Sequence, residues 1–371
     1  MKHISTITSI AALLLLCSCN CNQASYELLI GTYGEHLYEA SFDGEGFKVL
    51  NSIEAADPTY LCKGPDGTIY VPSAARVPHI YSFKNDVLTG MSDRIGRAPC
   101  YVLKVEGLPY VLTANYTTGS VSVFSIDSNG GIKENVQDIC YYGTGPNEAR
   151  QEKAHIHQVK ELPTDICRKA GIQGRWILAT DLGTDCVHLL SIDEDAPEGK
   201  FLIDRPDIEV TMNPGAGPRH MEFNEKARLL YVVCELNHDV YTYSITAEED
   251  GTPRFERLQC ISVPEAPQDG GADIHLSPDG KFIYSTYRLQ NDGMATFAVD
   301  QDGLLKYKGY VNTAAHPRNF YITPDGKWIL VASRDDKVIQ VFTRDEKTGM
   351  PQFSGIQMDF EQDKPVCIIA K

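Results

Sequence analysis

Proton transfer to or from an anionic substrate needs a base and positively charged groups. Four side chains from separate parts of the chain could supply them: His157, Arg219, Glu235 and Arg288. Histidine suits a general base because its unperturbed pKa lies nearest to neutral pH. Two arginines can hold a carboxylate or a phosphate through forked hydrogen bonds and stabilise developing negative charge. The glutamate could orient the histidine or a water molecule. The fold must therefore bring together residues that the sequence separates widely.

A repeated phrase in the sequence indicates how these residues could meet. It is clearest in three copies, at Pro58–Tyr70, Ser277–Tyr284 and Pro317–Ile329. Each copy contains a Pro-Asp-Gly turn leading into a strand; proline suits the first corner of such a turn and glycine accepts a positive φ. A third strand follows, as at Val338–Phe342, and then a fourth. Each repeat therefore predicts a unit of four antiparallel strands.

The phrase returns roughly every 40–60 residues, a period typical of the blades of a β-propeller. The successive units begin at Pro58, Pro99, Ile156, Pro218, Gly271, Pro317 and Pro365. Residues 26–53 hold three strands without the opening one, whereas Pro365–Lys371 is an opening strand with nothing after it. The two ends therefore predict one shared blade, which closes an all-β ring of seven blades and removes both free edges. A six-bladed ring with a stray C-terminal strand is the alternative.

The propeller predicts where the chemistry lies, because the first strand of a blade begins at the rim where its second strand ends. The residue after the first residue of the phrase is His157, Arg219 or Arg318 in three blades. The second strands of two neighbouring blades end at Glu235 and Arg288. These positions differ from blade to blade, as a single asymmetric pocket on a repeated scaffold requires.

Other interpretations of these polar residues stay open. Polar side chains that line a channel can simply be solvated. His155 alternates with His157 and could instead face into its blade, and His220 follows Arg219 on the opposite strand face, which favours a structural role. Arg150 lies in a long insertion that is either a lid or a plain loop.

Several phrases, taken in their order and spacing, resemble the lactonase family of seven-bladed β-propellers, and the similarity runs from Leu29 to the last strand. These phrases are Thr113–Tyr116, Gly119–Phe124, Arg150-Gln151, His155–His157, Asp181–Asp185, Gly215–His220, Cys234–Leu236 and Pro317-Arg318. The family includes the propeller-type 6-phosphogluconolactonase and the fungal 3-carboxy-cis,cis-muconate cyclase. In the cyclase branch a proposed active-site set of one histidine, two arginines and one glutamate resembles, by position, His157, Arg219, Arg288 and Glu235.

The resemblance implies a lactone hydrolase that opens a sugar-type lactone, acidic or phosphorylated. We expect His157, Glu235, Arg219 and Arg288 to be catalytic. We expect His155, Arg150, Arg318 and Asp181 to bind the substrate. A lactonising cycloisomerase of the carboxymuconate cyclase type is one alternative, and a non-catalytic surface propeller that binds a glycan or a protein is another.

No cofactor is expected, because the sequence contains no glycine-rich phosphate loop and no nucleophile elbow. It also lacks a recognisable metal-ligand cluster, so we predict no metal site, with a cation at Glu235, Asp181 or Asp273 as the open alternative. The net charge of −16 argues against nucleic acid as a partner, since nucleic-acid binding needs basic patches. A small-molecule lactone is the expected partner, and the chain is expected to be a monomer.

The first residues have the pattern of an export signal rather than of the fold. Lys2 and His3 precede a short apolar run that ends near Leu16, and a small residue, Ser18, comes just before Cys19, as in a bacterial lipobox. We therefore predict a lipoprotein signal peptide at residues 1–18, lipidation at Cys19, a tether at residues 19–25 and one propeller at residues 26–371. The expected location is the bacterial cell envelope, with the membrane contacted only through the lipid. The cysteines within the propeller are expected to be mostly free thiols.

Overall fold

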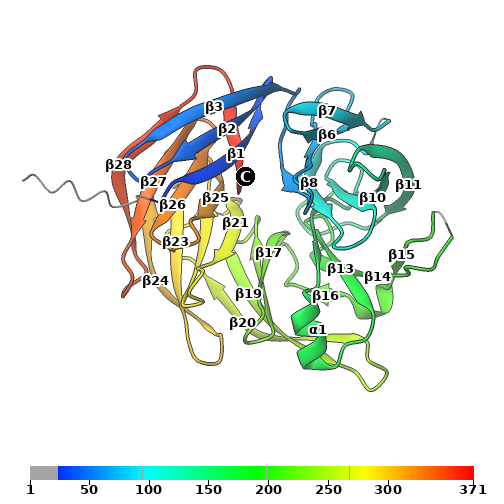
Figure 1. The fold of residues 1–371 in the computed structure, drawn as a ribbon. Helices are drawn as coiled ribbons and strands as arrows, with labels where there is room; N and C mark the ends of the chain where they lie inside the picture. The colour runs from blue at the N-terminus through cyan, green and yellow to red at the C-terminus, as the bar shows by residue number, and fades with distance from the viewer. Residues whose placement is uncertain (1–23, 94, 198, 267) are drawn as a thin grey trace, which may run out of the picture.

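The computed structural model describes residues 24–93, 95–197, 199–266 and 268–371. The predicted signal peptide and the predicted lipidation at Cys19 lie outside these residues. Within the described part of the chain, the strands form seven antiparallel sheets arranged around a common centre (Figure 1). The predicted all-β propeller of seven blades is therefore confirmed.

The first blade combines both ends of the chain, and the others follow in sequence order from the innermost strand outward. The first blade consists of β29 (Lys364–Ala370), β1 (Tyr26–Tyr33), β2 (His36–Phe42) and β3 (Phe47–Glu54). The second consists of β4 (Cys62–Lys63), β5 (Ile69–Pro72), β6 (Ile80–Lys84) and β7 (Val87–Met91). The third consists of β8 (Pro99–Lys104), β9 (Tyr110–Asn115), β10 (Ser120–Ile126) and β11 (Ile132–Cys140). The fourth consists of β12 (Ile156–Glu161), β13 (Arg175–Asp181), β14 (Cys186–Ile192), β15 (Leu202–Asp204) and β16 (Val210–Thr211).

The last three blades are regular sheets of four strands. The fifth consists of β17 (Pro218–Asn224), β18 (Leu229–Cys234), β19 (Asp239–Ala247) and β20 (Pro253–Ser262). The sixth consists of β21 (Gly271–Leu276), β22 (Phe282–Tyr287), β23 (Gly293–Val299) and β24 (Leu305–Asn312). The seventh consists of β25 (Pro317–Ile322), β26 (Trp328–Ser333), β27 (Val338–Arg344) and β28 (Pro351–Asp359).

Two blades depart from the expected pattern, and proline accounts for both. The opening strand of the second blade is reduced to β4 and one isolated bridge between Pro58 and Ser73. Pro72, at the end of β5, has no N–H to donate, so this end of the ladder cannot be completed. In the fourth blade a short 3₁₀ helix at Pro206–Ile208 divides the outer strand into β15 and β16, which both pair with β14.

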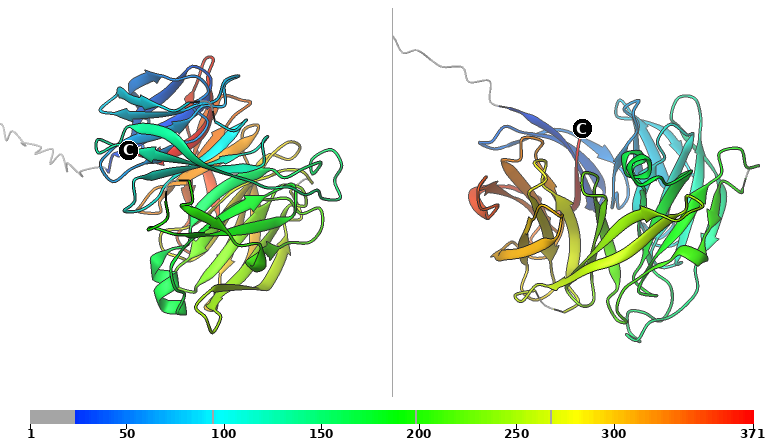
Figure 2. Two further views of the ribbon diagram at one scale, coloured as in Figure 1. Left: turned by 90° about the vertical axis from the view of Figure 1, so that its right-hand side faces the viewer. Right: turned by 90° about the horizontal axis from the view of Figure 1, so that it is seen from below.

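The hydrophobic core lies between the blades. Each cluster joins the facing sides of neighbouring sheets: Leu29 in β1 packs with Val71 in the second blade, and Ile30 packs with Leu330 in the seventh. The two views in Figure 2 show the short helix α1 (Thr164–Ala170) on the outside of the ring. Among the described residues, no helix has the length and apolar character needed to cross a bilayer. The eight cysteines in this part of the chain are all free thiols, as predicted.

The closure of the ring is the feature of the fold with the clearest test. Strand β29 pairs antiparallel with β1, with Ile368 opposite Ile30, and Ile368 N–H also donates to Asn319 Oδ1 at 2.7 Å. We expect deletion of residues 365–371 to destabilise the whole ring by several kcal/mol, because buried backbone groups of β1 lose their partners. Thermal unfolding measures the effect, with deletion of Lys371 alone as the control. A chain without β29 that melts within about 2 °C of the intact chain would contradict this closure.

Candidate active site

A cavity of about 320 Å³ opens at the rim where the inner strands begin and the second strands end. Five residues expected from the sequence line it: Arg150, His157, Glu235, Arg288 and Arg318. They come from the loop before β12 and from four blades of the ring. The fold therefore brings the widely separated polar residues to one mouth of the channel.

A bulge at the start of three inner strands, β12, β17 and β25, re-aims one side chain of each. In β12 the pairing with β13 skips His157, since Ile156 lies opposite Asp181 and Gln158 lies opposite Thr180. The ladders of β17 and β25 skip Arg219 and Arg318 in the same way. A bulge leaves one residue unpaired and re-aims its side chain. The bulge thus turns the second residue of these three phrases toward the channel axis.

Glu235 is the centre of a buried cluster of charges. It follows β18 and is 3 % exposed, and it accepts hydrogen bonds from three guanidinium groups. Arg150 Nη2 lies 2.5 Å from its Oε1, while Arg219 Nε and Arg288 Nη2 lie 3.0 and 2.9 Å from its Oε2. Burial alone would raise the pKa of Glu235, but Arg288, Arg219 and Arg150 outweigh burial and lower this pKa far below its ordinary value. Glu235 is therefore ionised at neutral pH, where it fixes the arginines and has no proton to donate.

His157 is held neutral beside this cluster. It is 4 % exposed, and its buried Nδ1 has no hydrogen-bond partner in the described structure. Burial, and then the charge of Arg219, lower its pKa well below 6.5. The edge of its ring meets Tyr116, with the ring centroids 5.7 Å apart. A neutral imidazole on the wall of a polar pocket can accept a proton from a water molecule.

Arg318 carries a charge that the protein leaves free for a ligand. Its guanidinium lies over the ring of Tyr33, 5.6 Å from the ring centroid. Within the described residues it makes no ion pair and no side-chain hydrogen bond, unlike Arg150, Arg219 and Arg288. Three arginines, Arg150, Arg288 and Arg318, thus line the pocket together with the single carboxylate of Glu235, whereas Arg219 is buried outside the lining and bound to Glu235. The excess of positive charge favours an anionic ligand.

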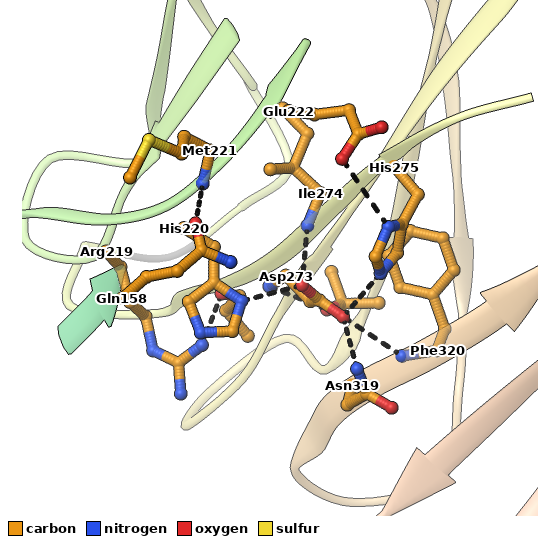
Figure 3. Close-up of polar contacts among 12 residues, drawn as sticks. Gln158, Arg219, His220, Met221, Glu222, Asp273, Ile274, His275, Asn319 and Phe320 are labelled. Atoms are coloured by element: carbon orange, nitrogen blue, oxygen red, sulfur yellow. Dashed lines mark hydrogen bonds and ion pairs between the residues drawn. The ribbon is translucent and has the colours of Figure 1, made fainter. Parts of the chain in front are cut away.

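A second polar network joins the inner strands of neighbouring blades, as Figure 3 shows. Its centre is the buried Asp273 in β21, which accepts hydrogen bonds from His220 Nδ1 at 2.7 Å, from Asn319 Nδ2 at 2.6 Å and from His275 Nε2 at 3.0 Å. Burial alone would raise the pKa of Asp273, but the charge of His275 and the bond from His220 outweigh it and hold this pKa well below its ordinary value. The network joins three inner strands, which agrees with a structural role for His220.

Two residues expected to bind substrate, His155 and Asp181, lie outside the residues that line the cavity. The His155 ring stacks on Tyr116 and bonds to the Tyr116 carbonyl at 3.0 Å, so it supports the pocket wall. Asp181 is fully buried, and its Oδ1 accepts the backbone N–H groups of His155 and Gly183. Both side chains are occupied by contacts within the protein, and their binding of substrate stays a prediction.

The cavity also contains residues that the sequence analysis did not select, among them Tyr33, Cys100 and Tyr116. Tyr116 OH accepts from Arg150 Nη2 at 3.2 Å and so helps to hold the arginine that reaches in from the insertion. The sequence did carry a signal for it, since Tyr116 occupies in the third blade the position that Glu235 and Arg288 occupy in theirs. Arg150 lies in the insertion, contacts Glu235 and lines the cavity, so the insertion forms part of the pocket wall.

Comparison with known proteins agrees with the seven-bladed fold. The family model described as lactonase, 7-bladed beta-propeller, matches residues 27–370. A 6-phosphogluconolactonase of Formosa agariphila is 33% identical over 335 residues, which cover 86% of this chain and 90% of that protein. The crystal structure of a Bacteroides fragilis protein assigned as a 6-phosphogluconolactonase aligns with a TM-score of 0.84 at 33% identity, covering 95% of this chain and 99% of the other. The periplasmic gluconolactonase of Pseudomonas aeruginosa aligns with a TM-score of 0.77 at 25% identity, covering 94% and 99%.

Proposed function

Since the chain belongs to the lactonase family of seven-bladed β-propellers, we propose that it hydrolyses a sugar-type lactone that carries an acidic or phosphate group. We choose an anionic lactone because the guanidinium of Arg318 is free in a pocket that is lined by three arginines and one carboxylate. The relatives named as 6-phosphogluconolactonases support the reaction class.

The reaction assigns a role to each group in the pocket. His157 takes a proton from a water molecule as the water oxygen bonds to the lactone carbonyl carbon. Arg288, which lines the cavity and is fixed by Glu235, stabilises the negative charge that develops on the carbonyl oxygen, while Arg219 holds Glu235 from outside the residues that line the cavity. The ring C–O bond then breaks, and His157 returns its proton to the departing ring oxygen. The new carboxylic acid loses its proton to solvent, so one proton is released per turnover.

A panel of lactones tests this proposal through the rate of acid release, corrected for spontaneous hydrolysis. The panel contains a neutral sugar lactone, its 6-phosphorylated form and a muconate lactone. We expect the largest kcat/KM for an anionic member of the panel. A surface propeller that only binds a partner predicts no turnover of any of them, and that result would refute the proposal.

Arg318→Ala separates binding of the anionic group from the chemical step. Removing the free guanidinium should raise KM for the phosphorylated lactone by about 10–100-fold, since a charge-assisted hydrogen bond contributes about 1.5–3 kcal/mol. The kcat should change little, and the neutral lactone should be hydrolysed as before. Arg168→Ala on helix α1 is the matched control, because this arginine is exposed and remote from the cavity. An equal loss with both lactones would assign Arg318 to the reaction itself.

We also propose that the chain is anchored to the cell envelope through a lipid on Cys19. The lipobox pattern at residues 16–19 supports this proposal. Cys19→Ala should move the protein from the membrane fraction to the soluble fraction, because acyl chains supply the membrane affinity. Fractionation and intact-mass measurement check the result. A wild-type protein that carries no lipid mass would contradict the assignment.

A further inference from the structure

A second cluster of reactive side chains lies at the turn between β13 and β14, outside the active-site cavity. It consists of Asp181 at the end of β13 and of Cys186 and His188 in β14. Asp181 and Cys186 are register partners across the two strands, and Cys186 and His188 share one face of β14 because they are two residues apart. The three residues are 0%, 3% and 6% exposed.

The three ligand atoms lie close enough together to share one metal ion after a rotation of the Cys186 side chain. His188 Nε2 lies 3.1 Å from Asp181 Oδ2 and 3.5 Å from Cys186 Sγ. Zinc binds nitrogen and oxygen at about 2.0–2.1 Å and sulfur at about 2.3 Å, so tetrahedral angles place N and O about 3.3 Å apart and N and S about 3.6 Å apart. The separation of His188 and Asp181 lies close to its value, but Cys186 Sγ is also 3.7 Å from His188 Nδ1, so it lies beside the imidazole ring and its side chain must rotate to reach an ion bound at Nε2. All three ligand atoms lie within 4.8 Å of one another.

The surroundings of His188 are those of a metal-bound histidine. Its other ring nitrogen, Nδ1, lies 2.9 Å from Glu209 Oε1. A carboxylate in this position keeps the proton on Nδ1 and leaves the lone pair of Nε2 for a metal. The Tyr141 ring stacks on the imidazole at 3.8 Å, with 11° between the planes, and shields one side of the cluster. The Thr184 hydroxyl donates to Asp181 Oδ2 at 2.7 Å and holds that carboxylate toward the site.

We propose that Asp181, Cys186 and His188 form a binding site for a zinc-type divalent ion, with water as the fourth ligand. Thiolate, imidazole and carboxylate together are a donor set that suits Zn²⁺. The role of the ion is structural. Asp181 Oδ1 accepts from the His155 backbone, and His155 lies two residues before His157, so a bound ion would fix the strand that carries the general base. This inference does not depend on the substrate proposed for the cavity.

The alternative to a metal ion is a protonated His188, whose two ring N–H groups would donate hydrogen bonds to Asp181 and Glu209. Metal titration separates the two. The purified full chain is stripped with a chelator and titrated with Co²⁺, which gives a thiolate-to-cobalt charge-transfer band when a cysteine is bound. We expect one equivalent of Co²⁺ per chain, with that band, and its displacement by Zn²⁺. No metal retained by the chain after gel filtration would overturn the proposal in favour of the proton.

Single replacements then locate the ion. Cys186→Ser is nearly isosteric, and it should abolish the charge-transfer band and stoichiometric retention while the protein without metal melts as before. Glu209→Gln should keep the band but weaken the affinity about 10–100-fold, the usual effect of losing a hydrogen-bond partner of a ligand. Cys140→Ser, at an exposed cysteine outside the cluster, is the matched control. A band that persists in Cys186→Ser and disappears in Cys140→Ser would place the ion elsewhere and overturn the assignment.

Discussion

Replacing His157 with glutamine is expected to lower kcat for the anionic lactone by about 10²–10⁴-fold, the usual contribution of a general base. The side chain has no hydrogen-bond partner on its buried Nδ1, so its loss leaves no protein group newly unpaired. KM should therefore change little, since Arg318 and the other arginines still hold the anion. The melting temperature should also stay close to that of the wild type. The steady-state rates of acid release for the two proteins measure the effect.

The dependence of the rate on pH gives an independent check of the same role. His157 acts as a base only when it is neutral, and burial together with Arg219 lowers its pKa well below 6.5. The value of kcat/KM should therefore be flat from neutral pH down to about 6.5 and should fall only in more acid solution. His36→Gln, at a partly exposed histidine of the first blade, is the control and should leave the rate unchanged. An acid limb centred above pH 7 would assign the base to another group.

The architecture of this protein could be predicted because a recognisable phrase returns along the chain, with a Pro-Asp-Gly turn in three of its copies. The Pro-Asp-Gly turns mark the strand pairs, and the incomplete first and last units are complementary, so the closed ring follows from the sequence alone. The rim position of His157, Arg219 and Arg318 also follows from the repeat. The reason why these side chains point toward the channel does not follow from the repeat. Each of them is the extra residue of a β-bulge, and a bulge depends on how two strands pair.

The contacts within the site were harder to predict, because they join blades that are distant in sequence. Arg150 reaches Glu235 across 85 residues, and no local pattern indicates such a bond. The same limit explains Asp181. Its phrase resembles the family, but only the paired strands show that the carboxylate lies against Cys186 and His188 rather than against the cavity. Residue type and rim position therefore indicate that a pocket exists, whereas the partners of each charge require the three-dimensional structure.

Glu235→Gln is expected to have the largest combined effect on stability and activity. The replacement preserves the shape of the side chain and removes the one charge that balances Arg150, Arg219 and Arg288. Breaking a buried ion pair leaves an uncompensated charge and costs about 3–5 kcal/mol. Burial and the charges of Arg288 and Arg318 already lower the pKa of Arg219 to about 9, which shows how strongly this site opposes further positive charge. Urea unfolding measures the loss.

The dependence of stability on pH distinguishes this charge effect from a loss of packing. The pKa of Glu235 is lower in the folded chain than in the unfolded chain, where a glutamate titrates near about 4.3. Its contribution is therefore fully present above the unfolded pKa and is lost as the pH falls through the folded pKa. Wild type and Glu235→Gln should differ most at neutral pH and approach each other in strong acid. Glu194→Gln, which removes an exposed partner of Arg175, should cost at most about 1 kcal/mol at any pH. A difference between wild type and Glu235→Gln that does not change with pH would mean that packing, rather than the ionised carboxylate, holds the three arginines in place.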